Sequence, residues 1–496
     1  MRLHDMLAGL DVRELLGGDV EVTSITNDSR RVQRAGCFAC IPGARVDGHD
    51  FAAAAVAGGA SALLVERVLD PAVVGTVAQA RVRSVRAALG PAASTLHGHP
   101  SRALRCLGVT GTNGKTTTTF LLESIAREAH LSVGVIGTVG ARVDGAPFAS
   151  AQVTPTTPEA SDLQALLAAM RDVGVGVVAM EVSSHGLERR EVDGTTFAAV
   201  CFTNLSHEHL DFHGTMDAYF DAKARLFDGS FAPAAAVNLD DEAGRRLAAR
   251  VASTSATLIT FGTRPDARFA ADEIAYDGRG TSFTLVDRDA DERAPVRTSL
   301  VGPFNVSNAL AAAATGVASG FSLDAVAAGL DRPVALPGRM QAVEQGQGFT
   351  VLVDYAHTPD ALTHVLGAAR AIAGEARVLA VFGAGGDRDR AKRPLMGEAV
   401  ARAADVAVLT SDNPRSEAPE EIAGAVLRGL RVGPAAVMVE LDRRAAIRLA
   451  LDAARPGDVV VIAGKGHETG QTVGDRTLPF DDRVVAGEEL GALGWS

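Results

Sequence analysis

The 496-residue sequence has few aromatic residues, few cysteines, very little lysine and no long apolar run. Aromatic residues make up only 4% of the chain, so its cores must be built mainly from alanine, valine and leucine. No segment approaches the roughly 18 consecutive apolar residues that suggest a membrane-spanning helix. The first residues include His4 and Asp5 within their apolar run, which excludes a signal peptide. These absences predict a cytoplasmic protein with no membrane partner.

An excess of positive charge is also missing. The formal net charge of −12 argues against nucleic acid as a main partner, and leaves anionic small ligands only in local positive pockets. Four cysteines in a chain of this length indicate a reducing compartment. Cys37 and Cys40 form a C-x-x-C pair, but no second pair follows it. We therefore interpret this segment as a buried strand rather than as a redox or metal site.

Lysine is the most informative scarcity. It occurs only at Lys115, Lys223, Lys392 and Lys465, so arginine supplies 44 of the 48 basic residues. A chain that uses arginine for ordinary positive charge keeps lysine where an amine is needed, as a compact ammonium or as a nitrogen that can be modified. The alternative is a coding bias toward arginine that has left four lysines at random positions. The position of each lysine decides between this alternative and a functional role.

The chain is too long for one hydrophobic core and predicts about three domains. Buried strands alternate with helical stretches, which is typical of α/β units with mostly parallel sheets. An alternating apolar and polar pattern at 272–302 instead indicates an antiparallel patch, and an Ala-rich helix is expected at 306–318. Residues 87–104, rich in Gly, Pro, Ser and His, suggest a linker. The predicted domains are residues 1–97, 98–332 and 333–496.

The segment "GVTGTNGKTTTT" follows a predicted buried strand and opens a predicted helix. Backbone N–H groups of such a loop bind phosphates, a lysine reaches the outer phosphates and the following hydroxyl binds Mg²⁺. The strict motif has glycine at position 109, where this chain has Val109. The core G-T-N-G-K-T nevertheless predicts nucleotide binding, with Lys115 and Thr116 in those two roles.

Acidic and histidine residues occur at the ends of later predicted strands, in "MEVSSHGLERREV", "FTNLSHEHLDFHG" and "LVDYAHTP". Ligands of an α/β sheet collect where strands end. Although a lone Glu or His is more often structural, this placement after a phosphate loop favours a metal site at Glu181 and His209.

Ten motifs together resemble one family. They are "TGTNGKTT", "MEVSSHG", "FTNLSHEHLDFHG", "DAKARLF", "GPFNVSNALAA", "LPGRM", "VDYAHTPDAL", "FGAGGDRDRAKRPLMG", "DNPRSE" and "AGKGHE", in this order. The sequence is similar to the Mur ligases of peptidoglycan synthesis over about residues 25–470. The resemblance implies α/β structure in three domains: a UDP-sugar domain, a central P-loop parallel-sheet ATPase domain and a C-terminal Rossmann-like domain for an amino acid.

The resemblance also implies an ATP-dependent ligase that joins meso-diaminopimelate to UDP-MurNAc-L-Ala-D-Glu through an acyl phosphate, as a monomer with ATP and two Mg²⁺ ions. Catalysis would use Lys115, Lys223, His209 and Glu181. The metal ligands would be Thr116, Glu181, His209 and Lys223, the last as a CO₂-derived carbamate. ATP binding is implied for Gly111, Thr112, Asn113, Gly114, Lys115, Thr116, Thr117, Asn305, Asn308, Arg339 and Asp354.

The two other substrates would have their own residues. For the UDP-MurNAc dipeptide these are Asn27, Ser29, Ala44, Arg45, Val46, Thr156, Thr157, Ser183 and Arg189. For diaminopimelate they are Arg388, Asp412, Asn413, Pro414, Arg415, Gly464 and Glu468. Two departures matter, because Glu191 stands where the family usually has arginine, and Arg189 stands where some relatives have glutamine. Either Arg190 makes the missing contact or that contact is made differently.

Two other functions remain open. The same family includes enzymes that add lysine or D-Ala-D-Ala, and relatives that extend folates. Arg415 argues against lysine, because only diaminopimelate offers a second carboxylate to a bidentate guanidinium. A P-loop kinase, motor or binding module without ligase activity is the other alternative. It does not explain the strand-end motifs of a second α/β unit.

Overall fold

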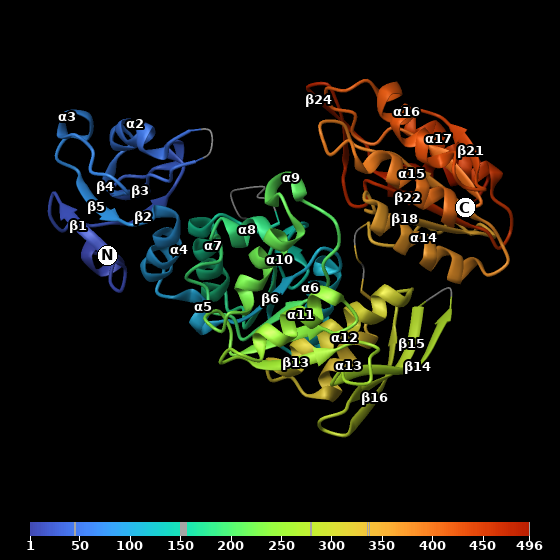
Figure 1. The fold of residues 1–496 in the computed structure, drawn as a ribbon, viewed down its shortest axis with the longest axis horizontal. Coiled ribbons are helices and arrows are strands. Elements are labelled where there is room, and N and C mark those ends of the chain that lie inside the picture. Colours follow the sequence, from blue (N-terminus) through green and yellow to red (C-terminus); the bar gives the residue numbers. More distant parts are fainter. Residues whose placement is uncertain (44–45, 149–155, 278–279, 335, 337, 496) are drawn as a thin grey trace. The chain divides into compact units, whose positions relative to one another are not determined.

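The computed structural model describes residues 1–43, 46–148, 156–277, 280–334, 336 and 338–495. The chain forms two compact units. Unit 1 comprises residues 1–205, 215–268 and 311–329, and unit 2 comprises residues 206–214, 269–310 and 330–496. Figure 1 follows the helices and strands along the chain. Within the described residues, no helix is both long enough and apolar enough to cross a membrane.

Unit 1 begins with a small α/β region. Its elements are α1 (Leu3–Met6), β1 (Val12–Leu16), β2 (Ser24–Thr26), β3 (Gly36–Ala39), α2 (Ala52–Ala57), β4 (Ala60–Val65), α3 (Pro71–Val74) and β5 (Ala78–Val82). The strands lie in the order β1-β5-β4-β3-β2, with only β1 antiparallel to its neighbour. Cys37 and Cys40 are buried in different hydrophobic clusters. Burial raises the pKa of each thiol to about 12, which agrees with a buried strand and not with a reactive pair.

The linker expected at 87–104 is wrong. Most of this segment is helical, in α4 (Val85–Leu96) and α5 (Pro100–Ala103), and α4 contains Pro91 in its interior. Gly90 is there for close packing, since a Cβ on it would lie 2.0 Å from the Asp193 carbonyl oxygen. Burial of the Ala and Leu side chains of α4 outweighs the helix-breaking tendency of Gly-Pro.

The phosphate-loop sheet forms the larger part of unit 1. Its elements are β6 (Arg105–Thr110), α6 (Lys115–Glu128), β7 (Val133–Gly137), β8 (Gly140–Val143), β9 (Ala146–Pro147), α7 (Ala160–Asp172), β10 (Val177–Glu181), α8 (Ser184–Glu188), β11 (Ala199–Phe202), α10 (Met216–Ala224), β12 (Ala234–Asn238), α11 (Glu242–Val251) and β13 (Thr257–Phe261). The strands lie in the order β13-β12-β11-β6-β10-β7-β8-β9. Those from β13 to β7 are parallel, as the sequence pattern predicts.

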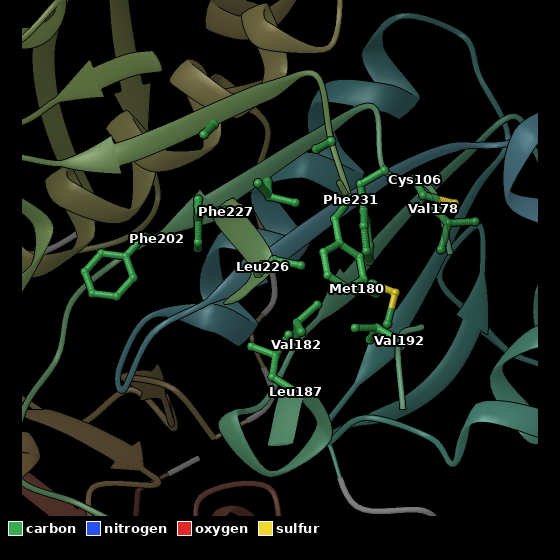
Figure 2. Close-up of a cluster of buried hydrophobic side chains, with 14 of the residues drawn as sticks. Cys106, Val178, Met180, Val182, Leu187, Val192, Phe202, Leu226, Phe227 and Phe231 are labelled. Carbon is green, nitrogen blue, oxygen red and sulfur yellow. The ribbon is translucent and has the colours of Figure 1, made fainter. Parts of the chain in front are cut away.

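A large apolar cluster supports this sheet (Figure 2). Its side chains come from strands, helices and connecting loops, and include Cys106, Val178, Met180, Val182, Leu187, Val192, Phe202, Leu226, Phe227 and Phe231. Phe202 and Phe227 meet edge to face, with ring centroids 6.2 Å apart. The cluster holds β6, β10 and β11 rigidly together, so the residues at their carboxyl ends have fixed relative positions.

The next part of the chain has three antiparallel strands and two long helices. With the short helix of segment 206–214, the elements are α9 (Leu210–His213), β14 (Phe269–Asp277), β15 (Gly280–Asp287), β16 (Glu292–Thr298), α12 (Pro303–Ala318) and α13 (Leu323–Asp331). The antiparallel patch is confirmed, because β15 pairs with both β14 and β16 in that sense. The Ala-rich helix is confirmed and begins three residues earlier than expected.

The last part of the chain contains a second parallel sheet and a separate two-stranded sheet, β23-β24. Its elements are β17 (Gln341–Ala342), β18 (Thr350–Asp354), α14 (Pro359–Ala373), β19 (Val378–Phe382), α15 (Lys392–Ala403), β20 (Val406–Leu409), α16 (Pro419–Leu430), β21 (Ala436–Val439), α17 (Arg443–Ala453), β22 (Val459–Ala463), β23 (Gly470–Val473), β24 (Arg476–Pro479) and α18 (Asp482–Ala492). The strand order is β17-β18-β22-β19-β20-β21, and only β17 is antiparallel to its neighbour. Helices α14, α15 and α16 cover one face, and α17 and α18 cover the other. This arrangement is the doubly wound fold that the sequence predicts.

Candidate active site

The phosphate loop, residues 111–114, connects β6 to α6 in unit 1. Gly111 and Gly114 have φ values of 147° and 87°, which other residues rarely adopt. A Cβ on Gly111 would lie 1.9 Å from Thr203 Oγ1, so the loop can pass there only as glycine. Lys115 Nζ donates to the carbonyl oxygens of Gly111 at 3.0 Å and Thr112 at 2.8 Å. The lysine side chain thus folds back onto the phosphate loop. Phosphates bind at such a loop in proteins where a glycine-rich segment connects a strand to the N-terminus of a helix.

Two residues after β11 hold the phosphate loop in shape. Asn204 Oδ1 accepts from the Asn113 N–H at 2.9 Å, and the Asn204 amide donates to the Asn113 carbonyl oxygen at 3.2 Å. Thr203 Oγ1 donates to the same carbonyl oxygen at 2.7 Å. Sequence reasoning did not select either residue, although both belong to the strand-end motif "FTNL". Their polar side chains at the end of a buried strand were the available signal.

Thr116 and Glu181 lie in direct contact. Because β6 and β10 are neighbours, with Val109 paired to Glu181, the end of β10 lies beside the start of α6. Thr116 Oγ1 donates to Glu181 Oε1 at 3.0 Å, and the carboxylate also accepts from the N–H and the hydroxyl of Thr138. A Cβ on Gly137 would lie 2.3 Å from Glu181 Oε1, so the glycine leaves room for the carboxylate. A hydroxyl and a buried carboxylate in contact form an oxygen donor pair of the kind that Mg²⁺ prefers.

Lys223 lies beneath the phosphate loop. Its side chain belongs to α10 and is almost completely buried, with 1% exposed. Lys223 Nζ donates to the Gly111 carbonyl oxygen at 2.7 Å and lies 4.7 Å from the ring centroid of Tyr219. The Tyr219 hydroxyl in turn lies 3.1 Å from Thr112 Oγ1. The structure therefore brings Lys223 and the phosphate loop together.

His209 falls in segment 206–214, which belongs to unit 2. It precedes α9 with a left-handed φ of 57°, and its Nε2 lies 3.6 Å from Glu208 Oε2. Among the described residues, no three His, Cys, Asp or Glu side chains gather as a metal site. A metal at Thr116 and Glu181 would therefore need further oxygen donors, such as a modified lysine, water or a substrate phosphate.

The residues expected to bind the sugar nucleotide form two contacting groups in unit 1. Asn27 Nδ2 donates to Glu159 Oε2 at 3.3 Å, and Arg31 forms an ion pair with Asp162 at 2.9 Å. Thr157 Oγ1 donates to Ser183 Oγ at 3.1 Å. The Thr156 hydroxyl lies 3.1 Å from that of Thr138, Ser29 begins a short 3₁₀ turn, and Val46 is exposed. Ala44 and Arg45 lie outside the described residues.

The structure answers where Arg190 points. Its guanidinium donates to Asp193 Oδ2 at 3.1 Å. Glu191 is buried with 4% exposed, and burial, reinforced by the nearby Glu159 charge, raises its pKa to about 8. Arg189 and Arg86 lower that pKa, but less strongly. A neutral carboxylic acid, which can donate a hydrogen bond, therefore occupies the position at neutral pH.

The nucleotide residues expected in unit 2 form two groups. Asn308 Nδ2 donates to Asn305 Oδ1 at 3.1 Å within α12, and Asn305 Nδ2 donates to the Val301 carbonyl oxygen at 2.8 Å. Asp354 ends β18 and accepts from the N–H groups of Met340 and Ala356, while burial raises its pKa. The Arg339 guanidinium lies 4.9 Å from the ring centroid of Tyr355.

Two loops follow β20 and β22 in unit 2, and we refer to them as loop 411–415 and loop 463–468. Asn413 Nδ2 donates to Glu468 Oε2 at 2.9 Å, and Lys465 Nζ donates to Asn413 Oδ1 at 3.0 Å and to Glu468 Oε2 at 3.2 Å. Asp412 Oδ1 is buried without a hydrogen bond, 3.8 Å from Lys465 Nζ. A buried oxygen without a donor is a place where a ligand amine can bind.

Arg415 extends from loop 411–415 toward residues 385–386. It has a left-handed φ of 52°, its N–H donates to the Thr472 carbonyl oxygen at 3.1 Å, and Nη1 donates to the Gly386 carbonyl oxygen at 2.7 Å. This backbone conformation costs a non-glycine residue about 1 kcal/mol, so surrounding contacts must hold it. Arg388 is exposed in the same region, whereas Arg393 and Glu417 form a buried ion pair at 2.7 Å.

Comparison with known proteins gives full-length matches. Three family models match, described as "Mur ligase family, catalytic domain" at residues 21–99, "Mur ligase middle domain" at 109–316 and "Mur ligase, glutamate ligase domain" at 338–466. The UDP-N-acetylmuramoyl-L-alanyl-D-glutamate–2,6-diaminopimelate ligase of Streptomyces coelicolor is 45% identical, over 95% of this chain and 93% of its own. The enzyme of the same name from Geobacillus kaustophilus is 44% identical, over 95% of both chains.

A solved structure also matches along the chain. It is that of a UDP-N-acetylmuramoyl-L-alanyl-D-glutamate–2,6-diaminopimelate ligase, with a TM-score of 0.70, 33% identity and 96% of both chains covered. The similar sequences and this solved structure therefore each match nearly the whole length of the chain.

Proposed function

The chain belongs to the Mur ligase family, and on this premise we propose that it is the ATP-dependent ligase that adds meso-2,6-diaminopimelate to the D-glutamate of UDP-N-acetylmuramoyl-L-Ala-D-Glu. The observation that carries the proposal is identity of 41–45% along essentially the whole chain with relatives that bear this name. The product is a precursor of peptidoglycan, made in the cytoplasm. The enzyme acts as a monomer, and its domains are residues 1–97, 98–332 and 333–496.

ATP binds at the phosphate loop. The loop N–H groups and Lys115 hold its phosphates, and Gly111 to Thr117 form the cradle. The contacts of Lys115 with the Gly111 and Thr112 carbonyl oxygens support this role, since a phosphate can replace those acceptors. Asn305 and Asn308 lie beside the adenine, and Arg339 and Asp354 bind near the ribose and phosphates.

Mg²⁺ fits the contacting Thr116 hydroxyl and Glu181 carboxylate, and His209 holds a second ion. Lys223 completes the site as a carbamate, which turns its amine into an oxygen donor. The burial of this lysine beside Gly111 supports the assignment. The choice of lysine in an arginine-rich chain supports it too, because arginine cannot undergo the same modification. When bound, the metal neutralises the negative charge that gathers on the phosphate oxygens.

The reaction has two steps. The D-glutamate side-chain carboxylate attacks the γ-phosphorus of ATP, and the bond between this phosphorus and the β-phosphate oxygen breaks. ADP is released, and the carboxylate has become an acyl phosphate. The amine of diaminopimelate then attacks the acyl carbon, loses a proton and expels inorganic phosphate, which leaves an amide. Lys115 and the loop N–H groups stabilise the charge on the transferred group in both steps.

The sugar nucleotide is held by Asn27, Ser29 and the segment 44–46 at its nucleotide end. Thr156, Thr157, Ser183 and Arg189 bind its peptide end. The contacts of Asn27 with Glu159 and of Thr157 with Ser183 support this assignment, because they join the leading region to the turn after Glu181.

The amine is held by Arg388, loop 411–415, Gly464 and Glu468. Asp412 and Glu468 bind ammonium groups, and Arg415 binds the distal carboxylate that lysine lacks. With lysine bound, the Arg415 guanidinium would lose its partner, which costs about 1–3 kcal/mol and so about tenfold to a hundredfold in selectivity. L-Lysine addition is the alternative function.

ADP release with UDP-MurNAc-L-Ala-D-Glu and a panel of amines tests the proposal. We expect turnover with meso-diaminopimelate at least about tenfold faster than with L-lysine at low amine concentration. Equal rates would refute the specificity. ADP release that needs neither the dipeptide nor an amine would refute ligase activity.

A further inference from the structure

A fully buried ion pair lies directly behind loops 411–415 and 463–468. Arg443 is the first residue of α17 and Asp482 is the first residue of α18, and both side chains have 0% of their surface exposed. Arg443 Nε donates to Asp482 Oδ1 at 2.8 Å, and Nη2 donates to Oδ2 at 2.7 Å. This bidentate geometry fixes the plane of the guanidinium.

The same guanidinium also contacts the base of each loop. Nη1 donates to the Ser411 carbonyl oxygen at 3.3 Å, and Nη2 donates to the Ala463 carbonyl oxygen at 3.0 Å. Ser411 immediately precedes Asp412, and Ala463 immediately precedes Gly464. One side chain therefore joins the starting points of two loops that are far apart in the sequence.

The sheet cannot make this connection by itself. Strands β20 and β22 are not neighbours, because β19 lies between them. Strand β20 ends at Leu409 and β22 ends at Ala463. The Gly464 N–H still donates to the Asp354 carbonyl oxygen at 3.0 Å, but Asp354 belongs to β18, which lies on the side of β22 away from β20. Asn413, Lys465 and Glu468 join the two loops farther from the strands, so it is at the loop bases that a side chain has to span the end of β19. Arg443 meets that requirement, and Asp482 holds it in the necessary orientation.

The positive charge of Arg443 interacts with carboxylates of both loops. Burial opposes the charge of Arg443, but the carboxylates of Asp482, Asp412 and Glu468 outweigh burial and raise its pKa. Asp412 and Glu468 are the two loop carboxylates proposed to hold the amine. The Arg443 guanidinium is therefore close enough to both loop carboxylates to interact with their charges.

We propose that Arg443 and Asp482 are positioning residues for the incoming amine, holding loops 411–415 and 463–468 at the separation at which both bind it. The inference rests on the proposed function. It assigns no contact with substrate to either residue. It predicts an effect on amine binding that is separate from ATP binding and larger than a general loss of stability explains.

The test compares two conservative variants with a matched control. Arg443→Lys keeps the charge but loses the planar fork, and Asp482→Asn keeps the shape but loses the charge. The control is Arg377→Lys, because Arg377 also forms an ion pair with an aspartate, Asp458, at 2.6 Å, although its side chain is 30% exposed. Arg377 and Asp458 precede β19 and β22, so this pair lies at the opposite ends of strands in the same sheet.

Steady-state KM values for diaminopimelate and for ATP are measured below the Tm of each variant. We expect Arg443→Lys and Asp482→Asn to raise the amine KM about tenfold to a hundredfold, since small misplacement of binding groups has effects of this size. The ATP KM stays within twofold for both, and Arg377→Lys changes neither KM beyond twofold. If Arg443→Lys does not fold, Asp482→Asn alone decides.

An amine KM within twofold of wild type in the folded variant would overturn the proposal. So would equal increases in the KM values for amine and ATP. Wild-type protein without amine-dependent ADP release would instead refute the proposed function. The two failures are therefore distinguished by the wild-type measurement.

Discussion

Lys223 Nζ lies 2.7 Å from the carbonyl oxygen of Gly111, so a buried lysine supports the first residue of the phosphate loop. The two residues are 112 positions apart in the sequence. They meet because α10 packs beneath the loop, where Tyr219 also contacts Thr112. A change at Lys223 therefore acts directly on the phosphate loop.

Replacement of Lys223 should abolish turnover while the protein remains folded. We expect Lys223→Ala to lower kcat roughly 10²–10³-fold, because an oxygen donor for the metal is lost. Acetate or formate should restore part of the activity by taking the place of the carbamate oxygens. Lys223→Arg keeps a positive charge but cannot form a carbamate, and should remain inactive with or without these anions. Near-wild-type turnover of Lys223→Arg would exclude the carbamate.

The contact between Thr116 and Glu181 predicts a specific metal dependence. Thr116→Val removes the hydroxyl and keeps the shape, so we expect the Mg²⁺ concentration for half-maximal activity to rise about tenfold or more. Thr118→Val is the matched control on α6, since the Thr118 hydroxyl is buried without a hydrogen bond. Titration of ADP release with Mg²⁺ measures both variants. An unchanged Mg²⁺ requirement in Thr116→Val would remove this residue from the metal site.

Arg415 should affect the amine and not the nucleotide. Arg415→Ala is expected to raise the KM for diaminopimelate about tenfold to a hundredfold, because a charge-assisted pair with the distal carboxylate is lost. The KM for ATP should stay within twofold. Arg402→Ala is a suitable control, since that exposed arginine forms an ion pair with Glu398 on α15. A shift in the ATP KM alone would place Arg415 at the nucleotide instead.

Glu191 should make stability depend on pH. Its pKa of about 8 in the folded protein lies above its ordinary value of 4.5, so the folded state binds more protons between these pH values. Its favourable contribution is complete below about pH 4.5 and is lost as pH rises through about 8. For one proton the slope approaches about 1.4 kcal/mol per pH unit.

Urea unfolding of wild type and Glu191→Gln between pH 5 and pH 9 measures this effect. The amide cannot ionise, so the stability of Glu191→Gln relative to wild type should increase with pH. Parallel stability curves over the whole range would show that Glu191 is already ionised at low pH. Glu188→Gln, an exposed change three residues earlier, provides the control.

Local sequence patterns predicted the elements well. The phosphate loop, the antiparallel patch at 272–302 and the Ala-rich helix at 306–318 depend on neighbouring residues, whose spacing is visible in one sequence. The linker expected at 87–104 failed because tertiary packing overrode a local signal. Gly90 is required by the close approach of Asp193, and the apolar residues around Pro91 are buried.

Sequence motifs predicted residues of the candidate site, but they did not predict which side chains contact one another. Motif resemblance identified Lys115, Glu181 and Lys223, but it omitted Thr203 and Asn204, whose role is to shape the loop from a neighbouring strand. Such contacts depend on strand order, which a motif does not contain.

The sequence by itself determined the α/β fold class, the phosphate loop and the family, because these depend on residue types at short, fixed spacings. Only the tertiary structure decided which distant side chains meet. Thr116 reaches Glu181 because β6 and β10 are adjacent, and Arg443 reaches Ser411 and Ala463 because β19 separates the strands before them. Packing of the sheets sets these neighbours, and packing depends on the whole chain at once.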